Sequence, residues 1–177
     1  AVAGATGAAA AIPVVGWIVA ALALIDMVSG GKLFGTKFKA KEITSTLGVT
    51  ETGGYAGAEL LEERQKALFG GRKQRVRAVD PGDEAKQAAA DLYAAIHETA
   101  EQAADALGLA SVDIIEGSFT RVTNAKGQLK REFSTILGAV YSETAEEFSQ
   151  RLNAENIIGQ IAQVDELASG IAQRWRG

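Results

Sequence analysis

The sequence contains no cysteine and a single histidine among its 177 residues. Without cysteine the chain forms no disulfide framework and no thiolate zinc site. With His97 as the one histidine, a histidine-rich metal site and a Ser-His-Asp triad are both disfavoured. We therefore expect no metal, no cofactor and no catalytic residue, and we expect His97 to be an ordinary surface or half-buried side chain.

Carboxylate pairs are the remaining candidates for an enzyme. Glu98 and Glu101 fall on one face of a predicted helix, where two carboxyl groups can in principle do acid/base chemistry. That helix is rich in Asp and Glu throughout. We expect both carboxylates to be solvated surface groups.

Charge is absent from the first 25 residues. The apolar run Ala8–Ile25 is long enough as a helix to cross a bilayer, which needs roughly 20 residues. A secretory signal peptide is disfavoured, because no basic segment precedes the run. Two interpretations stay open: a helix that contacts lipid, and a helix packed inside an oligomer through small residues at four-residue spacing. The candidate membrane-interacting residues are Ile12, Val14, Val15, Trp17, Ile18, Val19, Leu22, Leu24 and Ile25.

The net charge of −4 hides an asymmetry along the chain. Between Lys32 and Arg77 there are ten basic and five acidic residues, and from Ala78 onward eight basic and sixteen acidic ones. A basic half can contact phosphates, lipid headgroups or an acidic partner. The alternative that we favour is a solvated sheet face, because no aromatic residues interleave with the basic ones as nucleic-acid binding would require.

Alternation of polar and apolar residues predicts a β-sheet. We expect strands over Thr36–Val49, Lys73–Val79 and Val112–Thr123, with a bulge near Glu42–Ile43 where the phase of the first strand shifts. Tyr55–Gln65 fits either a helix or a continuing strand.

Apolar residues at three- and four-residue spacing predict two amphipathic helices. The first runs from Asp83, a plausible N-cap, to Leu107, and the second from about Gln128 to Leu152. The expected fold class is α+β: an apolar N-terminal helix in residues 1–29, an α+β domain with a small antiparallel sheet and two helices in residues 30–155, and a coiled-coil-like C-terminal helix in residues 156–177.

The C-terminal segment carries a heptad seam about three heptads long. β-branched residues at both seam positions favour three or more strands, whereas docking of this helix on its own domain is the open alternative. The candidate interface residues, spaced four, three, four, three and four apart, are Ile157, Ile161, Val164, Ala168, Ile171 and Trp175.

The order of elements and short glycine-rich motifs resemble the C-terminal region of tail tape measure proteins of long-tailed bacteriophages. The resemblance covers roughly residues 30–155. It is carried by Gly-Gly-Lys-Leu-Phe-Gly at 30–35, by KALFGGRKQRVR at 66–77, by ALGLASVDIIEGSF at 106–119 and by the predicted helix LKREFSTILGAVYSETAEEFSQRL that follows.

The resemblance implies a structural virion protein at the distal end of the tail. Such proteins lie in the lumen of the tail tube, set its length during assembly and contact the tail-tip or baseplate hub and distal tail proteins. The family is commonly thought to be present as three copies, so the first expected partner is the chain itself, as a homotrimer. On infection the protein leaves the tube ahead of the DNA, so the host membrane is a further partner and phage DNA a transient neighbour. No catalytic residues carry over for this region.

A membrane-anchored or pore-forming bacterial protein is the alternative function. The apolar helix would be the anchor and the α+β part a soluble domain. Lysines just after the apolar run would then favour a cytoplasmic location for that domain under the positive-inside rule.

Overall fold

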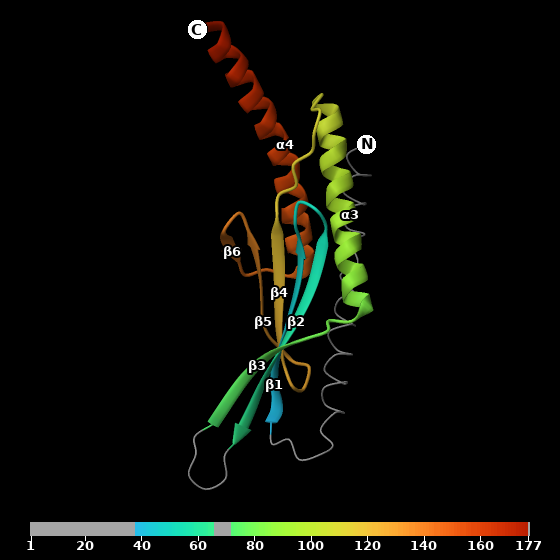
Figure 1. The fold of residues 1–177 in the computed structure, drawn as a ribbon, viewed down its shortest axis with the longest axis vertical. Coiled ribbons are helices and arrows are strands. Elements are labelled where there is room, and N and C mark those ends of the chain that lie inside the picture. The colour runs from blue at the N-terminus through green and yellow to red at the C-terminus, as the bar shows by residue number, and fades with distance from the viewer. Residues whose placement is uncertain (1–37, 66–71, 177) are drawn as a thin grey trace.

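The computed structural model describes residues 38–65 and 72–176. Figure 1 shows the arrangement of the elements in this part of the chain. In chain order the elements are β1 (Phe38–Val49), β2 (Gly54–Gln65), β3 (Arg72–Val79), α3 (Asp83–Ala106), β4 (Gly117–Asn124), β5 (Leu129–Ile136), β6 (Ala139–Tyr141) and α4 (Ala145–Arg176).

The described strands form one six-stranded sheet in the order β3-β2-β1-β4-β5-β6. Every neighbouring pair is antiparallel. The predicted α+β class with an antiparallel sheet is therefore confirmed. The helix α3 lies between β3 and β4 in the chain, and it connects one edge of the sheet to the strand next to β1.

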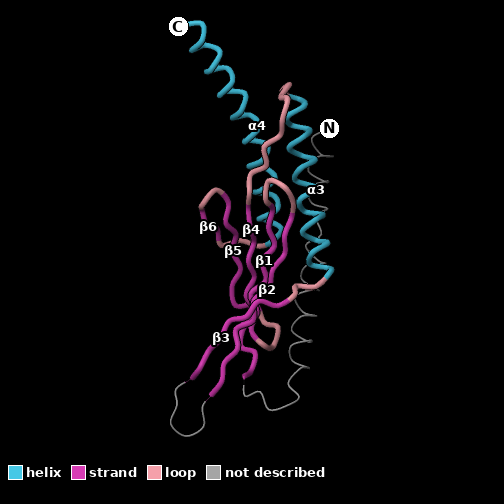
Figure 2. Tube along the Cα trace, viewed as in Figure 1, coloured by secondary structure: helices cyan, strands magenta, loops and turns pink. Residues whose placement is uncertain are grey.

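The hydrophobic core lies between the sheet and the two described helices. α3 packs on β1 and β2, and α4 packs on β4 and β5 as well as on α3, as the tube trace in Figure 2 also shows. Alternate residues of each strand face this core. Burying one large apolar side chain stabilises the fold by about 1.5–3 kcal/mol. The largest buried side chains here include Val49, Leu92, Ile96, Phe119, Ile136, Phe148 and Leu152.

The described strands that precede α3 match the sequence prediction closely. The register between β1 and β2 shifts between Ala40 and Glu42, next to the predicted bulge. Tyr55–Gln65, which fitted two interpretations, belongs to β2. The predicted strand at Lys73–Val79 is β3, in which Val76 is exposed and Val79 is partly buried.

Helix α3 has the predicted extent but a different N-cap. The N-cap residue is Gly82 with φ 92°, and no side chain caps the helix. Asp80 Oδ1 instead accepts a hydrogen bond of 2.9 Å from the Gly82 N–H. Asp83 lies in the first turn, where its charge interacts favourably with the helix dipole. Gly108, with φ 73°, follows the C-terminus.

The helix predicted from Gln128 to Leu152 is wrong over its first half. That half forms β5 and β6, joined by a tight turn in which Leu137 has φ 52° and Gly138 has φ 77°. The left-handed conformation at two successive residues is typical of a two-residue hairpin turn. The apolar spacing there fits a helix and a hairpin equally, and the turn decides between them.

The strand predicted from Val112 to Thr123 begins later than expected. β4 starts at Gly117, and residues 109–116 form an extended segment outside the sheet. This segment lies against α4, which supplies the hydrogen-bond partners that a neighbouring strand would otherwise provide.

The predicted apolar helix in residues 1–29 and its membrane-interacting residues Ile12–Ile25 lie outside the described residues. Within residues 38–65 and 72–176, no helix combines the length and the apolar character needed to cross a bilayer.

Candidate functional site

The most distinctive feature of the molecule is the length of α4. It is one continuous helix of 32 residues, about 48 Å long at 1.5 Å per residue. Its first half packs on the domain, and its second half extends past the sheet and past the end of α3 (Figure 1). The predicted boundary between residues 155 and 156 falls inside this helix, so domain and C-terminal helix share a rigid element.

One face of α4 docks on the domain. Phe148 and Leu152 enter the core, where the ring of Phe148 stacks on that of Phe119 with centroids 5.7 Å apart. Gly159 contacts Ile115: a Cβ at position 159 would lie 2.8 Å from Ile115 Cδ1. The docked face therefore needs a small residue where the extended segment crosses the helix.

Two buried amides fix α4 to the extended segment. Asn156 Oδ1 accepts a hydrogen bond of 2.8 Å from the Ile115 N–H, and Asn156 Nδ2 donates to the Leu152 carbonyl at 2.9 Å. Gln160 Nε2 donates to the Asp113 carbonyl at 2.7 Å. Both side chains are fully buried. They give the Ile115 N–H and the Asp113 carbonyl hydrogen-bond partners on α4. Sequence reasoning missed them because Asn and Gln within a helix are usually exposed.

An ion pair holds the start of α4. Arg151 Nε donates to Glu143 Oε2 at 3.0 Å, and Ser134 donates to the same buried carboxylate. The guanidinium lies 3.9 Å from the centroid of the Tyr141 ring. The hydrogen bond to Glu143 raises the pKa of Arg151 above its ordinary value. This cluster ties β5, β6 and α4 together at the base of the long helix.

The predicted seam residues lie on another face of α4. Successive residues are rotated by about 100°, which places the centre of the seam roughly 110° from the centre of the docked face. Val164 is half-buried and Ala168 is exposed, and the exposed fractions of the other four are 37% for Ile157, 47% for Ile161, 55% for Ile171 and 85% for Trp175.

The seam therefore does not serve to dock α4 on the described part of its own domain. Even Ile157 and Ile161, which flank the domain, leave a large part of their surface in solvent. Ile158 and Leu167 widen the apolar surface on either side, with exposed fractions of 56% and 59%. Exposed apolar residues that recur along one face of a helix are typical of a surface that contacts another protein or a membrane.

Carboxylates on β2 neutralise part of the basic stretch. Arg75 and Arg77 donate hydrogen bonds to the buried Glu62 at 3.2 and 2.8 Å, and Lys41 pairs with Glu63 at 3.0 Å. Burial opposes ionisation of Glu62, but the two guanidiniums outweigh it and lower the pKa of the carboxyl. These cross-strand pairs agree with the solvated sheet face that the sequence favoured.

Glu62 should make stability depend on pH. Because its pKa in the folded state lies below the ordinary value of 4.5, the ion pairs stabilise the fold above that pH and lose their effect as pH falls through the folded pKa. We expect Glu62→Gln to lower the free energy of unfolding by about 1 kcal/mol at pH 7 and by much less at pH 3. Urea unfolding at both pH values measures this. Glu59→Gln, an exposed site on the same strand, is the control, and an equal loss at the two pH values would contradict the assignment.

The acid/base candidates lie on the surface of α3. Glu98 and Glu101 are exposed on α3. His97 is half-exposed, as expected, and lies 3.6 Å from Glu101. Among the described residues, no group of His, Asp and Glu side chains is placed to hold a metal ion.

Comparison of the chain with protein-family models, with curated proteins and with solved structures found no match.

Proposed function

We propose that this chain is a structural virion protein, the tip-proximal C-terminal part of a phage tail tape measure protein that self-associates as three copies. The observation that carries the proposal is the exposed seam of α4, which continues from the flank of the domain to Trp175. The short glycine-rich motifs that resemble the tape measure family supply the biological setting.

Three copies suit the seam for a physical reason. Ile and Val occupy both seam positions at Ile157, Ile161, Val164 and Ile171, and this pattern favours trimers and tetramers over dimers. The domain lies to one side of each helix, so the seam faces away from it. Three helices can therefore meet along a common axis while their domains stay outside the bundle.

The assembly would sit in the tail tip or baseplate, at the distal end of the tail tube. Its contacts would be the hub and distal tail proteins, and it would contribute to tail assembly and length determination. At infection it would leave the tube and assist passage of DNA through the host envelope. The apolar run Ala8–Ile25 suits both states, because a helix satisfies its own backbone hydrogen bonds among protein copies and in lipid alike.

The location and copy number of the chain in the native particle test this proposal. Gold-labelled antibody against residues 145–176 should mark the distal tip of intact tails, and quantitative mass spectrometry should find about three copies per tail. Absence of the chain from purified tails would refute the proposal, and recovery in bacterial membranes instead would favour the membrane-anchored alternative.

A charge placed in the seam should prevent self-association. Ile161→Asp would bury an unpaired carboxylate between helices, so we expect the dissociation constant to rise by at least about 100-fold. Sedimentation velocity of the full chain measures this. Ala162→Asp, which adds the same charge at the next, exposed position, should leave association unchanged. A monomeric wild type at high micromolar concentration, or equal effects of both variants, would contradict self-association through the seam.

A further inference from the structure

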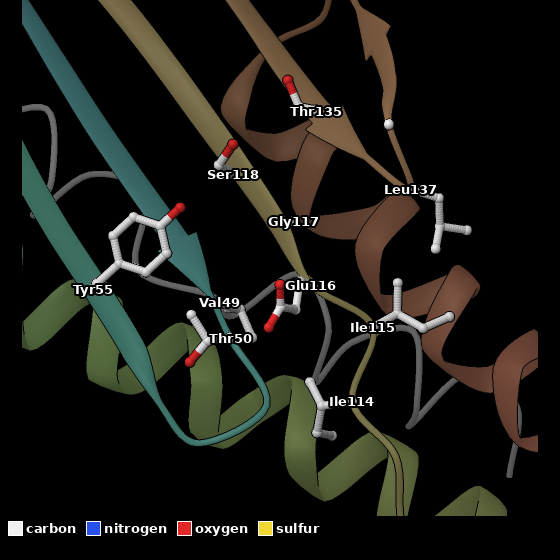
Figure 3. Close-up of a pocket in the computed structure, with 11 residues that line it drawn as sticks. Val49, Thr50, Tyr55, Ile114, Ile115, Glu116, Gly117, Ser118, Thr135 and Leu137 are labelled. Carbon is white, nitrogen blue, oxygen red and sulfur yellow. The ribbon is translucent and has the colours of Figure 1, made fainter.

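An open groove lies at one end of the sheet, on the far side from the docked face of α4. Its volume is about 500 Å³. The turn after β1, the last residues of the extended segment and the turn between β5 and β6 surround it, as Figure 3 shows. Tyr55 on β2, Ser118 on β4 and Thr135 on β5 line the groove. All three belong to the sheet face that points away from the helices, because Gly54 and Phe119 beside them face the core.

The ring of Tyr55 is held flat on the sheet. Tyr55 is paired directly opposite Gly48 on β1, and a Cβ at position 48 would lie 2.3 Å from Tyr55 Cζ. Only a glycine at 48 therefore leaves room for the ring. Tyr55 nevertheless keeps 43% of its surface exposed, so one face of a fixed aromatic ring is available to a ligand.

The remaining lining combines hydroxyl groups with apolar side chains. Thr50, Tyr55, Ser118 and Thr135 each carry a hydroxyl, and Glu116 is the one charged residue among those that line the groove. Leu137 and the half-buried Ile115 supply apolar surface beside them, whereas Val49 and Ile114 border the groove as buried core residues. Leu137 adopts its left-handed conformation at φ 52° with 69% of its surface exposed. This conformation belongs to the two-residue turn between β5 and β6, which places the exposed Leu137 side chain beside the groove.

The residues that line the groove indicate which class of ligand it can bind. A flat ring stacks on the apolar face of a pyranose, hydroxyls and a carboxylate exchange hydrogen bonds with sugar hydroxyls, and an apolar wall accommodates the methyl of an acetamido group. A lining with one carboxylate and no cation suits neither phosphate nor nucleic acid. We propose that this groove binds a neutral N-acetylated oligosaccharide, with a sugar ring stacked on Tyr55. The inference does not depend on the proposed virion function.

Titration of the full chain with a β-1,4-linked N-acetylglucosamine tetramer tests this, using saturation-transfer NMR and calorimetry. An open groove supports weak binding, so we expect a dissociation constant of roughly 1 mM and contact of the sugar ring protons with an aromatic ring. Maltotetraose, which has no acetamido group, should bind at least about tenfold more weakly. Absence of binding at about 10 mM tetramer, or equal binding of both sugars, would overturn the proposal.

Two substitutions and one control locate the site. Tyr55→Ala removes the ring, and Gly48→Ala displaces it while keeping the tyrosine; each should weaken binding about tenfold or more. Gly57→Ala is the control, because a Cβ at that position on the same strand meets no atom within 4 Å, and it should bind as wild type does. Circular dichroism and a thermal midpoint verify that the variants fold. Wild-type affinity in folded Tyr55→Ala would overturn the assignment, and so would wild-type affinity in folded Gly48→Ala.

Discussion

Gly54→Ala should destabilise the domain by about 3 kcal/mol, the upper part of the range for overpacking a core. Gly54 begins β2 and touches the backbone of α3: a Cβ there would lie 2.0 Å from the Ala89 carbonyl oxygen and 2.5 Å from its carbon. A helix backbone cannot rotate away as a side chain can. Either the strand or α3 must move, and Ala89 itself is buried in the core.

The adjacent glycine provides the control for this experiment. A Cβ on Gly53 meets no atom within 4 Å, so Gly53→Ala should change the free energy of unfolding by less than about 0.5 kcal/mol. Equilibrium unfolding in urea, followed by circular dichroism, compares the two variants with wild type. Equal effects of the two substitutions would show that the contact between Gly54 and α3 does not limit stability.

Asn156→Ala should cost about 2–3 kcal/mol, because it leaves the Ile115 N–H buried without its acceptor. The substitution should lower the overall stability and should also loosen the extended segment around Ile115. Hydrogen exchange at the Ile115 amide should accelerate more than exchange in the centre of α3, since the extended segment loses its attachment to α4. The two measurements are urea unfolding and residue-resolved exchange.

Gln150→Ala is the matched truncation, one and a half turns earlier on the exposed side of α4. It should leave both stability and exchange near wild type. If Asn156→Ala exchanged at Ile115 as slowly as wild type, the segment would be held by apolar contacts alone, and the role assigned to the amide would be wrong.

The sequence predicted those elements whose local pattern has a single interpretation. α3 combines a turn signal at Asp80–Gly82, a continuous apolar stripe and a terminal glycine at 108, and all three indicate the same helix. β1 was equally clear, including its bulge. The pattern of the β5–β6 hairpin had two interpretations, because its apolar residues satisfy helical spacing by coincidence. These residues are Leu129, Phe133, Ile136 and Val140.

One signal for the true start of α4 was present but missed. Thr144 and Glu147 have the spacing of a capping box, and the structure shows the Glu147 N–H donating to Thr144 Oγ1 at 3.2 Å. Together, the cap at Thr144 and the turn glycine Gly138 indicate a hairpin before residue 144 and a helix that begins at Ala145. The capping residues therefore located the start of α4 better than the apolar spacing did.

The seam could be predicted in part from the sequence, whereas the docked face of α4 and the groove could be found only from the three-dimensional structure. The spacing from Ile157 to Trp175 identified the seam, but exposure depends on which face of α4 docks on the domain. The docked face contains Asn156 and Gln160, which no hydrophobic pattern selects. The groove required the register of β1 and β2, because Gly48 and Tyr55 are neighbours across the strands and not along the chain.

The charged edge strand has a consequence for solubility. β3 is one edge of the sheet, and its residues 73–78 are all exposed. Lys73, Arg75 and Arg77 alternate along it, and Glu62 compensates part of the charge of the two arginines. The strand keeps an excess of positive charge, so two molecules that approached edge to edge would repel each other. An unpaired edge otherwise invites strand addition and amyloid-like stacking. At high protein concentration, the remaining positive charge on this edge opposes edge-to-edge association of the sheet.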